Sequence, residues 1–149
     1  MNFPDHDAVN AQTGFLLKKV STASFEAFAA IVGAHGLHPM HFGMLMMIDA
    51  EEPISQRDLS CRTGIDQSTM VARMDVLVEK GLVDRLRSEE DRRSYEISLS
   101  TQGRRCLKKL RKEAQEQGVR FYSPLTEEER VLLHALLEKL ANGVDDVRP

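Results

Sequence analysis

The chain has 149 residues, of which 42% are hydrophobic and 29% are charged, and its formal net charge at pH 7 is −3. This length favours a single domain over residues 1–149, and the composition is that of an ordinary globular protein. The slight acidity gives no general attraction to nucleic acid, so any binding to DNA would need locally placed cations.

No apolar run reaches the ~18 residues that a membrane-spanning helix needs, and residues 1–10 lack the basic and apolar regions of a signal peptide. We therefore expect a cytoplasmic protein without a membrane partner. Cys61 and Cys106 form no CxxC pair, which argues against a disulfide framework or a structural zinc site. Both lie in apolar helical patterns, so we expect them to be packed inside; whether either senses oxidants stays open.

Apolar residues that recur every three or four positions predict a long first helix over about residues 11–33. Gly33 and Gly36 end it. A second helix starts at His38 and Pro39, because proline is acceptable at the first helical position, and runs to about residue 50. This second helix is apolar nearly all round, so we expect it to lie centrally in the fold.

Two shorter helices then predict a helix-turn-helix. Ser55 is a good N-cap for a helix over residues 56–63, which ends at Gly64, and Asp66 caps a helix over residues 67–80. In such a motif the second helix places its N-terminal residues against base edges in the major groove of DNA. We expect its inward face to consist of Met70, Val71, Met74, Leu77 and Val78.

Alternating residues predict two strands, 83–87 and 95–99, joined by a charged tip. Ser100 then caps a long helix over about residues 101–121. A β-hairpin directly after a helix-turn-helix is the layout of a winged helix-turn-helix. The fold class is therefore mainly α with a small β-hairpin wing, and residues 37–100 form the DNA-binding lobe.

The last helix begins at a capping box of Thr126 and Glu129 and carries a stripe of leucines. The first and last helices are too apolar to stand alone in water. The simplest arrangement packs them together and against a second copy of the chain. We therefore expect a homodimer whose dimerisation helices comprise residues 10–34 and 101–143.

The helix over residues 67–80 is the expected recognition helix. The candidates for contacts with double-stranded DNA are polar residues at its start and arginines of the wing. Gln can bond adenine, Arg can bond guanine, and Ser or Thr can reach bases or phosphate. A wing arginine can enter a narrow minor groove, and Asp91 could hold one arginine in place. The alternatives are a solvated helix face and surface salt bridges. The candidates are Ser55, Gln67, Ser68, Thr69, Arg73, Arg87, Arg92 and Arg93.

A basic run over residues 104–112 could contact phosphates, although a solvated helix is favoured. His35, His38 and His41 have a spacing that can suggest a metal site, but Gly36 and Pro39 make this segment a turn, so helix-junction histidines are favoured. We expect no metal and no other cofactor. No phosphate-binding loop or catalytic motif is present, so an enzyme is not expected.

The segment from Gly36 to Leu110 resembles the MarR family of multiple-antibiotic-resistance-type regulators. The matching segments are His38–Phe42 (HPMHF), Ile54–Leu59 (ISQRDL), Gln67–Thr69 (QST) and Glu79–Val83 (EKGLV). The most specific match is the wing pattern Asp-x-Arg…Leu-Thr-x-x-Gly, here Asp91, Arg93, Leu99 and Gly103. Ser100 stands where the family usually has Thr, which keeps a capping hydroxyl.

The resemblance implies a dimeric, repressor-like regulator that binds a pseudo-palindromic operator and is often released by a small ligand. It places the ligand pocket between the dimerisation helices and the DNA-binding lobe. For each pocket candidate named below, the alternative role is packing in the core or at its rim. Redox-sensing relatives have a reactive cysteine near the start of the first helix, and this chain has none before Cys61. A winged-helix interaction module that has lost DNA binding is the rival function. The pocket candidates are Phe15, Lys19, His38, His41 and Met44.

Overall fold

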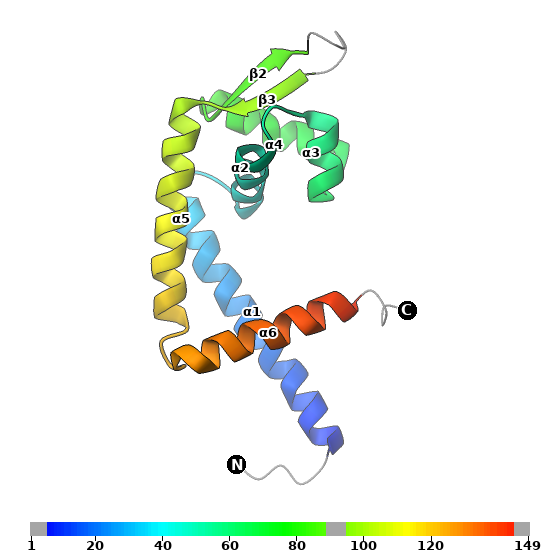
Figure 1. Ribbon diagram of the computed structural model, residues 1–149, viewed down its shortest axis with the longest axis vertical. Coiled ribbons are helices and arrows are strands. Elements are labelled where there is room, and N and C mark those ends of the chain that lie inside the picture. The colour runs from blue at the N-terminus through cyan, green and yellow to red at the C-terminus, as the bar shows by residue number, and fades with distance from the viewer. Residues whose placement is uncertain (1–5, 89–94, 145–149) are drawn as a thin grey trace. The chain divides into compact units, whose positions relative to one another are not determined.

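The computed structural model describes residues 6–88 and 95–144 (Figure 1). The chain divides into two compact units, residues 1–114 and 115–149. The elements in chain order are α1 (His6–Ala34), α2 (Pro39–Glu51), β1 (Ile54–Ser55), α3 (Gln56–Thr63), α4 (Gln67–Glu79), β2 (Val83–Arg87), β3 (Tyr95–Leu99), α5 (Thr101–Phe121) and α6 (Glu127–Gly143). The predicted fold class, mainly α with a small wing, is confirmed.

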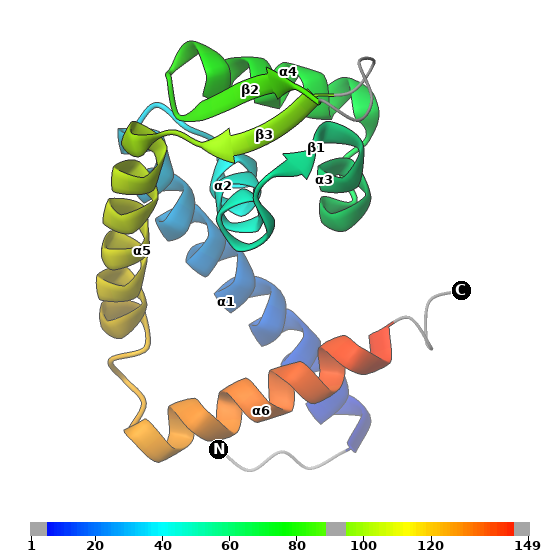
Figure 2. The ribbon, with the colours of Figure 1, turned by 45° about the horizontal axis from the view of Figure 1, so that its top comes forward.

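The three strands form an antiparallel sheet in the order β1-β3-β2. Val83 pairs with Leu99 and Arg87 with Tyr95, so β2 and β3 have their predicted bounds. The short β1, which was not predicted, pairs Ile54 with Ile97 at the edge of the sheet beside α3 (Figure 2). Two residues are too few to show an alternating pattern, so only the folded sheet reveals this strand.

N-cap side chains mark where α3, α4 and α6 begin, as the sequence predicted. The Ser55 hydroxyl accepts a hydrogen bond from the Asp58 N–H at 3.0 Å, and an Asp66 carboxylate oxygen accepts one from the Thr69 N–H at 3.0 Å. Thr126 and Glu129 form the predicted capping box. Each cap satisfies an N–H group that would otherwise lack a partner at a helix start.

The core of the first unit forms around α2. Met44, Leu45 and Ile48 have no exposed surface, and Phe28 of α1 packs edge-on against Phe42 at 5.2 Å. Met46 is 37% exposed, so α2 is not buried all round as its composition predicted.

The predicted inward face of α4 is correct at three positions and wrong at two. Met70, Met74 and Leu77 are completely buried, whereas Val71 and Val78 are 44% and 39% exposed. Each valine follows a buried residue by one position, about 100° around the helix, which places it at the edge of the buried stripe.

The first turn of α5 lies directly against the start of the wing. The Ser100 hydroxyl donates to the Gly81 carbonyl at 2.6 Å and accepts from the Gly103 N–H at 2.9 Å, while the Ser100 N–H donates to the Leu82 carbonyl. A Cβ atom at position 103 would lie 1.9 Å from the Leu82 carbonyl oxygen. Only glycine therefore permits this approach of helix to strand.

Two histidines cap α2 with an unusual capping box. The His38 Nδ1 accepts from the Met40 N–H at 3.1 Å, and the His41 Nδ1 accepts from the His38 N–H at 2.9 Å. His41 is 2% exposed, and burial, aided by the nearby positive charge of Arg73, lowers its pKa to about 4. His41 is thus neutral at pH 7, with its proton on Nε2 because Nδ1 is an acceptor.

The helix α6 presents a stripe of leucines that remains exposed in the single chain. The Arg130 Nε donates to the carbonyls of Tyr122 and Leu125, which fastens α6 to the turn before it. Leu132, Leu136 and Leu140 are nevertheless more than half exposed. The helix α1 also exposes large apolar side chains in the single chain: Phe15, Leu16, Leu17, Val20 and Phe25. Across residues 6–88 and 95–144, no helix is both long and apolar enough to cross a membrane.

The Gly103→Ala variant should have a free energy of unfolding lower by about 3 kcal/mol or more, because the obstructing atom is backbone and cannot rotate away. Gly118→Ala, in the same helix, is the matched control. No atom lies within 4 Å of its added Cβ, so this change should raise the free energy of unfolding by about 0.5–1 kcal/mol. Urea denaturation followed by circular dichroism measures both; equal effects would contradict the close approach.

The neutral, buried His41 should make the protein less stable as the pH falls from about 6.5 to about 4. The unfolded state, with the ordinary pKa of 6.5, takes up a proton in this range before the folded state does. The loss should reach about 3 kcal/mol. Denaturation at several pH values, compared between the natural protein and His41→Asn, isolates this contribution. A variant that keeps the whole pH dependence between 6.5 and 5 would show that His41 is not its source.

Candidate nucleic-acid interface

The start of α4 presents polar side chains around a capped helix end. The Ser68 hydroxyl donates to the Asp66 carboxylate at 2.6 Å. This bond, with those from Thr69, holds the pKa of Asp66 well below its usual range. Ser68 therefore has only its acceptor lone pairs left for a ligand, while the neighbouring Gln67 side chain is exposed.

The remaining candidates on the two helices differ in their exposure and partners. Thr69 and Arg73 are half-buried on α4. Ser55 is the N-cap of α3, and its hydroxyl both donates to the Asp58 carboxylate at 2.7 Å and accepts from the Asp58 N–H. The structure thus brings Gln67, Thr69 and Arg73 together on one helix and gives Ser55 mainly a capping role.

The two described arginines of the wing have different surroundings. The Arg85 guanidinium lies 4.2 Å from the centroid of the Tyr95 ring and 3.8 Å from the Asp75 carboxylate of α4. It therefore links the recognition helix to both wing strands, a role that the sequence did not indicate. Arg87 is exposed at the end of β2, 6.0 Å from the same ring. Asp91, Arg92 and Arg93 lie outside the described residues.

Asp49 of α2 and Glu52, the C-cap of α2, pair with two arginines of the basic run on α5. Arg104 lies 2.5 Å from the Glu52 carboxylate and 3.7 Å from that of Asp49, and Arg111 bonds Asp49 at 2.9 Å. Glu52 also accepts from the Leu99 N–H at 2.8 Å. This arrangement favours the interpretation of the run as a solvated helix over a phosphate-binding surface. Sequence reasoning missed it because Asp49 and Glu52 are far from α5 in the chain.

The histidines of the 35–41 segment have separate hydrogen-bond partners. His35 Nε2 lies 2.7 Å from a carboxylate oxygen of Glu113 on α5, whereas His38 and His41 form the capping box of α2. Within the described ranges, no group of three or more His, Cys, Asp or Glu residues could hold a metal ion. The geometry is that of the helix-junction histidines that the sequence favoured.

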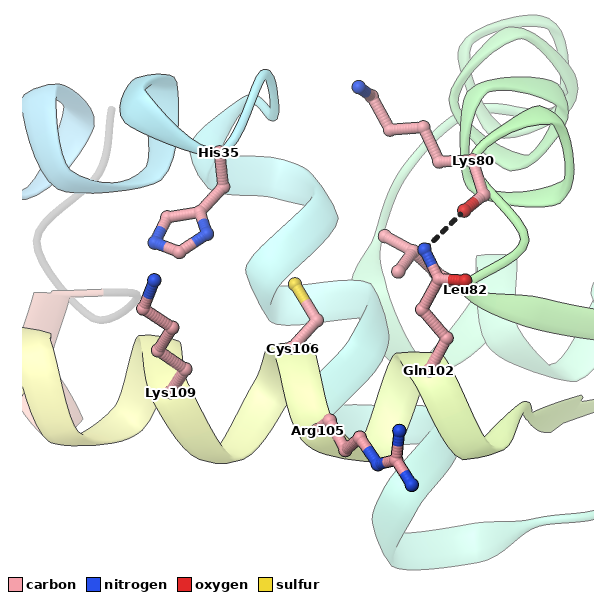
Figure 3. A pocket seen from close by; sticks show the side chains of 7 residues that line it. All are labelled: His35, Lys80, Leu82, Gln102, Arg105, Cys106 and Lys109. Atoms are coloured by element: carbon pink, nitrogen blue, oxygen red, sulfur yellow. Dashed lines mark hydrogen bonds between the residues drawn. The ribbon is translucent and has the colours of Figure 1, made fainter.

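The residues suggested for a ligand pocket are in different environments in the single chain. Phe15 and Lys19 are exposed on α1, His38 is half-buried, and His41 and Met44 are buried. None of the five lines the cavity between the ends of α1 and α4 and the first turns of α5 (Figure 3).

The two cysteines differ, and the expectation for one of them is wrong. Cys61 is exposed on α3, because its neighbours Leu59 and Ser60 take the buried positions of this short helix. Cys106 on α5 is half-buried, and burial raises the pKa of its thiol.

Comparisons with known proteins agree with this architecture. The model of the MarR family matches residues 35–94. A candidate transcriptional regulatory protein for the hcr operon of Thauera aromatica is 32% identical over 136 residues, covering 91% of this chain and 82% of that protein. The transcriptional repressor CouR, solved with a 23-mer DNA duplex, has a TM-score of 0.79 and 29% identity, covering 94% of this chain and 99% of that chain.

The transcriptional regulator PcaV from Streptomyces coelicolor has the same fold, with a TM-score of 0.78 at 23% identity over 91% of this chain and 98% of that chain. These relatives are named as transcriptional regulators. The resemblance found in the sequence is therefore confirmed. The chain belongs to the MarR family of winged helix-turn-helix transcriptional regulators.

Proposed function

We propose that this protein is a sequence-specific DNA-binding repressor that acts as a homodimer on a pseudo-palindromic operator. The observation that carries the proposal is the exposed polar start of α4, the second helix of a helix-turn-helix that is tied to a wing. The similarity to CouR, a repressor solved with a DNA duplex, supports it. The lobe proposed to bind DNA spans residues 37–100.

In the proposed complex, Gln67, Thr69 and Arg73 face base edges in the major groove, where glutamine bonds adenine and arginine bonds guanine. Ser68 accepts only, because its proton is bonded to Asp66. Ser55 contributes a phosphate contact from the start of α3.

The wing acts in the adjacent minor groove. Arg87 lies at the exposed end of β2. The sequence places Arg92 and Arg93 at the tip, with Asp91 as the carboxylate that orients one of them.

The exposed apolar side chains of α1 and α6 support the homodimer. A single chain leaves Phe15, Leu16, Leu132, Leu136 and Leu140 each more than half exposed, which is costly in water. A second copy would cover them and set two recognition helices about one helical turn of DNA apart. The dimerisation helices would comprise residues 10–34 and 101–143.

A small effector that releases the repressor would bind where the dimerisation helices meet the lobe. The proposed pocket includes Phe15, Lys19, His38, His41 and Met44, with the Lys19 ammonium suited to an organic anion. The buried Nε2 of His41 supports this, because it is a donor with no partner among the described residues. Such a ligand must bind the DNA-competent and the released states with different affinities.

Substitution of Arg73 or Arg93 by Ala should lower operator affinity by about 1–3 kcal/mol, or about 5- to 150-fold. Fluorescence anisotropy with the DNA upstream of this protein's own gene, at several salt concentrations, measures the effect. Arg120→Ala, at the exposed end of α5, serves as the control and should bind like the natural protein.

If Arg93→Ala binds the operator as tightly as the natural protein, Arg93 does not contact the minor groove. If Arg73→Ala does so, Arg73 does not contact the major groove. No salt-sensitive binding of the natural protein to any such fragment would favour the rival function, a winged-helix interaction module.

Size-exclusion chromatography with light scattering should give the natural protein about twice the chain mass of 16.8 kDa. Leu136→Lys places a charge in the exposed leucine stripe of α6 and should yield monomers, because a buried unpaired charge is costly. Glu138→Lys introduces the same side chain on the opposite face of α6 and should remain dimeric. A natural protein that is monomeric at high concentration would exclude the proposed dimer.

A further inference from the structure

The outward face of α4 contains apolar side chains that the proposed DNA contacts do not use. Val71 is 44% exposed, and Ala72, the next residue, is also exposed. The inward stripe of the helix is formed without them by Met70, Met74 and Leu77, which are completely buried. Val71 and Ala72 are therefore accessible to a partner of the lobe.

Val71 lies beside the polar start of the helix. Residues three and four apart are neighbours on a helix surface, so Val71 adjoins both Ser68 and Gln67. These two residues are exposed in the first turn after the N-cap Asp66. In a helix-turn-helix, this first part of the second helix faces the bases. A duplex that contacts the start of α4 must therefore also meet Val71.

Val71 and Arg73 lie on opposite flanks of α4. Residues two apart are separated by about 200° around a helix axis, and Arg73 is half-buried. The major groove is about 12 Å wide and a helix with its side chains is about 10–12 Å across, so an inserted helix contacts the groove with both flanks. The flank of Val71 would thus face base pairs that Arg73 does not contact.

The neighbours of Val71 on this flank offer a phosphate no positive charge. Ser68 and Ala72 are uncharged, and the Ser68 proton is already bonded to a carboxylate. Asp75, one turn further on, is negative, and the Arg85 guanidinium at 3.8 Å offsets this charge. The surface around Val71 therefore favours an uncharged, apolar group.

The apolar group that the major groove offers to such a surface is the C5-methyl of thymine. Adenine, the partner of thymine, offers its N6 and N7 atoms to a glutamine amide. Gln67 and Val71 are four residues apart, about 40° around the helix, so they lie on the same side. Together the two side chains are suited to A·T base pairs.

We propose that Val71 contacts the C5-methyl group of a thymine in each half-site of the operator. The valine methyls cover the thymine methyl, and Gln67 bonds the adenine of the same or the adjacent base pair. The small side chain of Ala72 lets the helix approach the base edges closely. This contact rests on the proposed function, because it adds a specificity-determining residue to the same recognition helix.

Replacement of thymine by uracil tests the contact at the level of one methyl group. Uracil pairs with adenine as thymine does and lacks only the C5-methyl. The probe is the DNA upstream of this protein's own gene, amplified with either thymidine or deoxyuridine triphosphate and titrated by fluorescence anisotropy. The natural protein should bind the uracil fragment about fifteenfold more weakly, from about fourfold for each half-site.

Val71→Ala completes a double-mutant cycle with the DNA change. The site is exposed and alanine has the higher helix propensity, so the fold should be retained. The variant should bind the thymine fragment about fifteenfold more weakly than the natural protein does and show little further loss on the uracil fragment. The dependence of affinity on salt should stay unchanged, because no phosphate contact is removed.

Val78→Ala is the matched control. It is the same substitution on the same helix, at a residue that is 39% exposed and lies seven positions nearer to the C-terminal end. This variant should bind both fragments as the natural protein does. Uracil placed at one thymine at a time should confine the loss to one position in each half-site, and the two positions should be related by the symmetry of the operator.

The outcomes separate this contact from the proposed function. Equal affinity of the natural protein for the two fragments would overturn the thymine contact and leave the proposed function in place. A full loss on the uracil fragment in Val71→Ala would also overturn it, because another residue would then contact the methyl groups. No salt-sensitive binding to either fragment would exclude the proposed function, and this contact with it.

Discussion

The contact between Gly103 and the backbone of Leu82 is the constraint on which the rest of the first unit depends. A residue with a side chain at position 103 would drive α5 away from the sheet, because the obstructing atom is a carbonyl oxygen. The same junction contains the hydrogen bonds of Ser100 to Gly81 and Leu82. The end of the recognition helix, the start of the wing and the start of the long helix therefore meet at one close-packed point.

Charge pairing between the C-terminal end of α2 and α5 compensates two of the cations in the basic run of α5. Arg104 and Arg111 of α5 pair with Asp49 of α2 and with Glu52, the residue that follows α2. Long-range attraction to a polyanion is thereby reduced. In the proposed complex, recognition of DNA would then depend on a small number of individually placed side chains on α4 and the wing.

Features encoded by neighbouring residues could be predicted from the sequence, and features made by distant residues could not. Ser55 and Asp66 cap their helices through bonds three residues away, so the pattern alone was sufficient. By contrast, the strand β1 exists because Ile54 meets Ile97. The exposure of Cys61 likewise depends on which side of the short α3 faces the core. The DNA candidates on α4 were placed on one helix correctly, but the cavity beside Cys106 had no local signal.

Arg85 has a consequence for the thermodynamics of binding. Its contacts with Asp75 and Tyr95 hold the recognition helix and the wing strands in one fixed arrangement. Such preorganisation reduces the conformational entropy lost when two elements must engage a partner simultaneously. The fixed arrangement of helix and wing also limits the groove widths that the lobe could fit. A duplex with an unsuitable groove width would itself have to deform, so the shape of the DNA, and not only its bases, would enter the selection of sites.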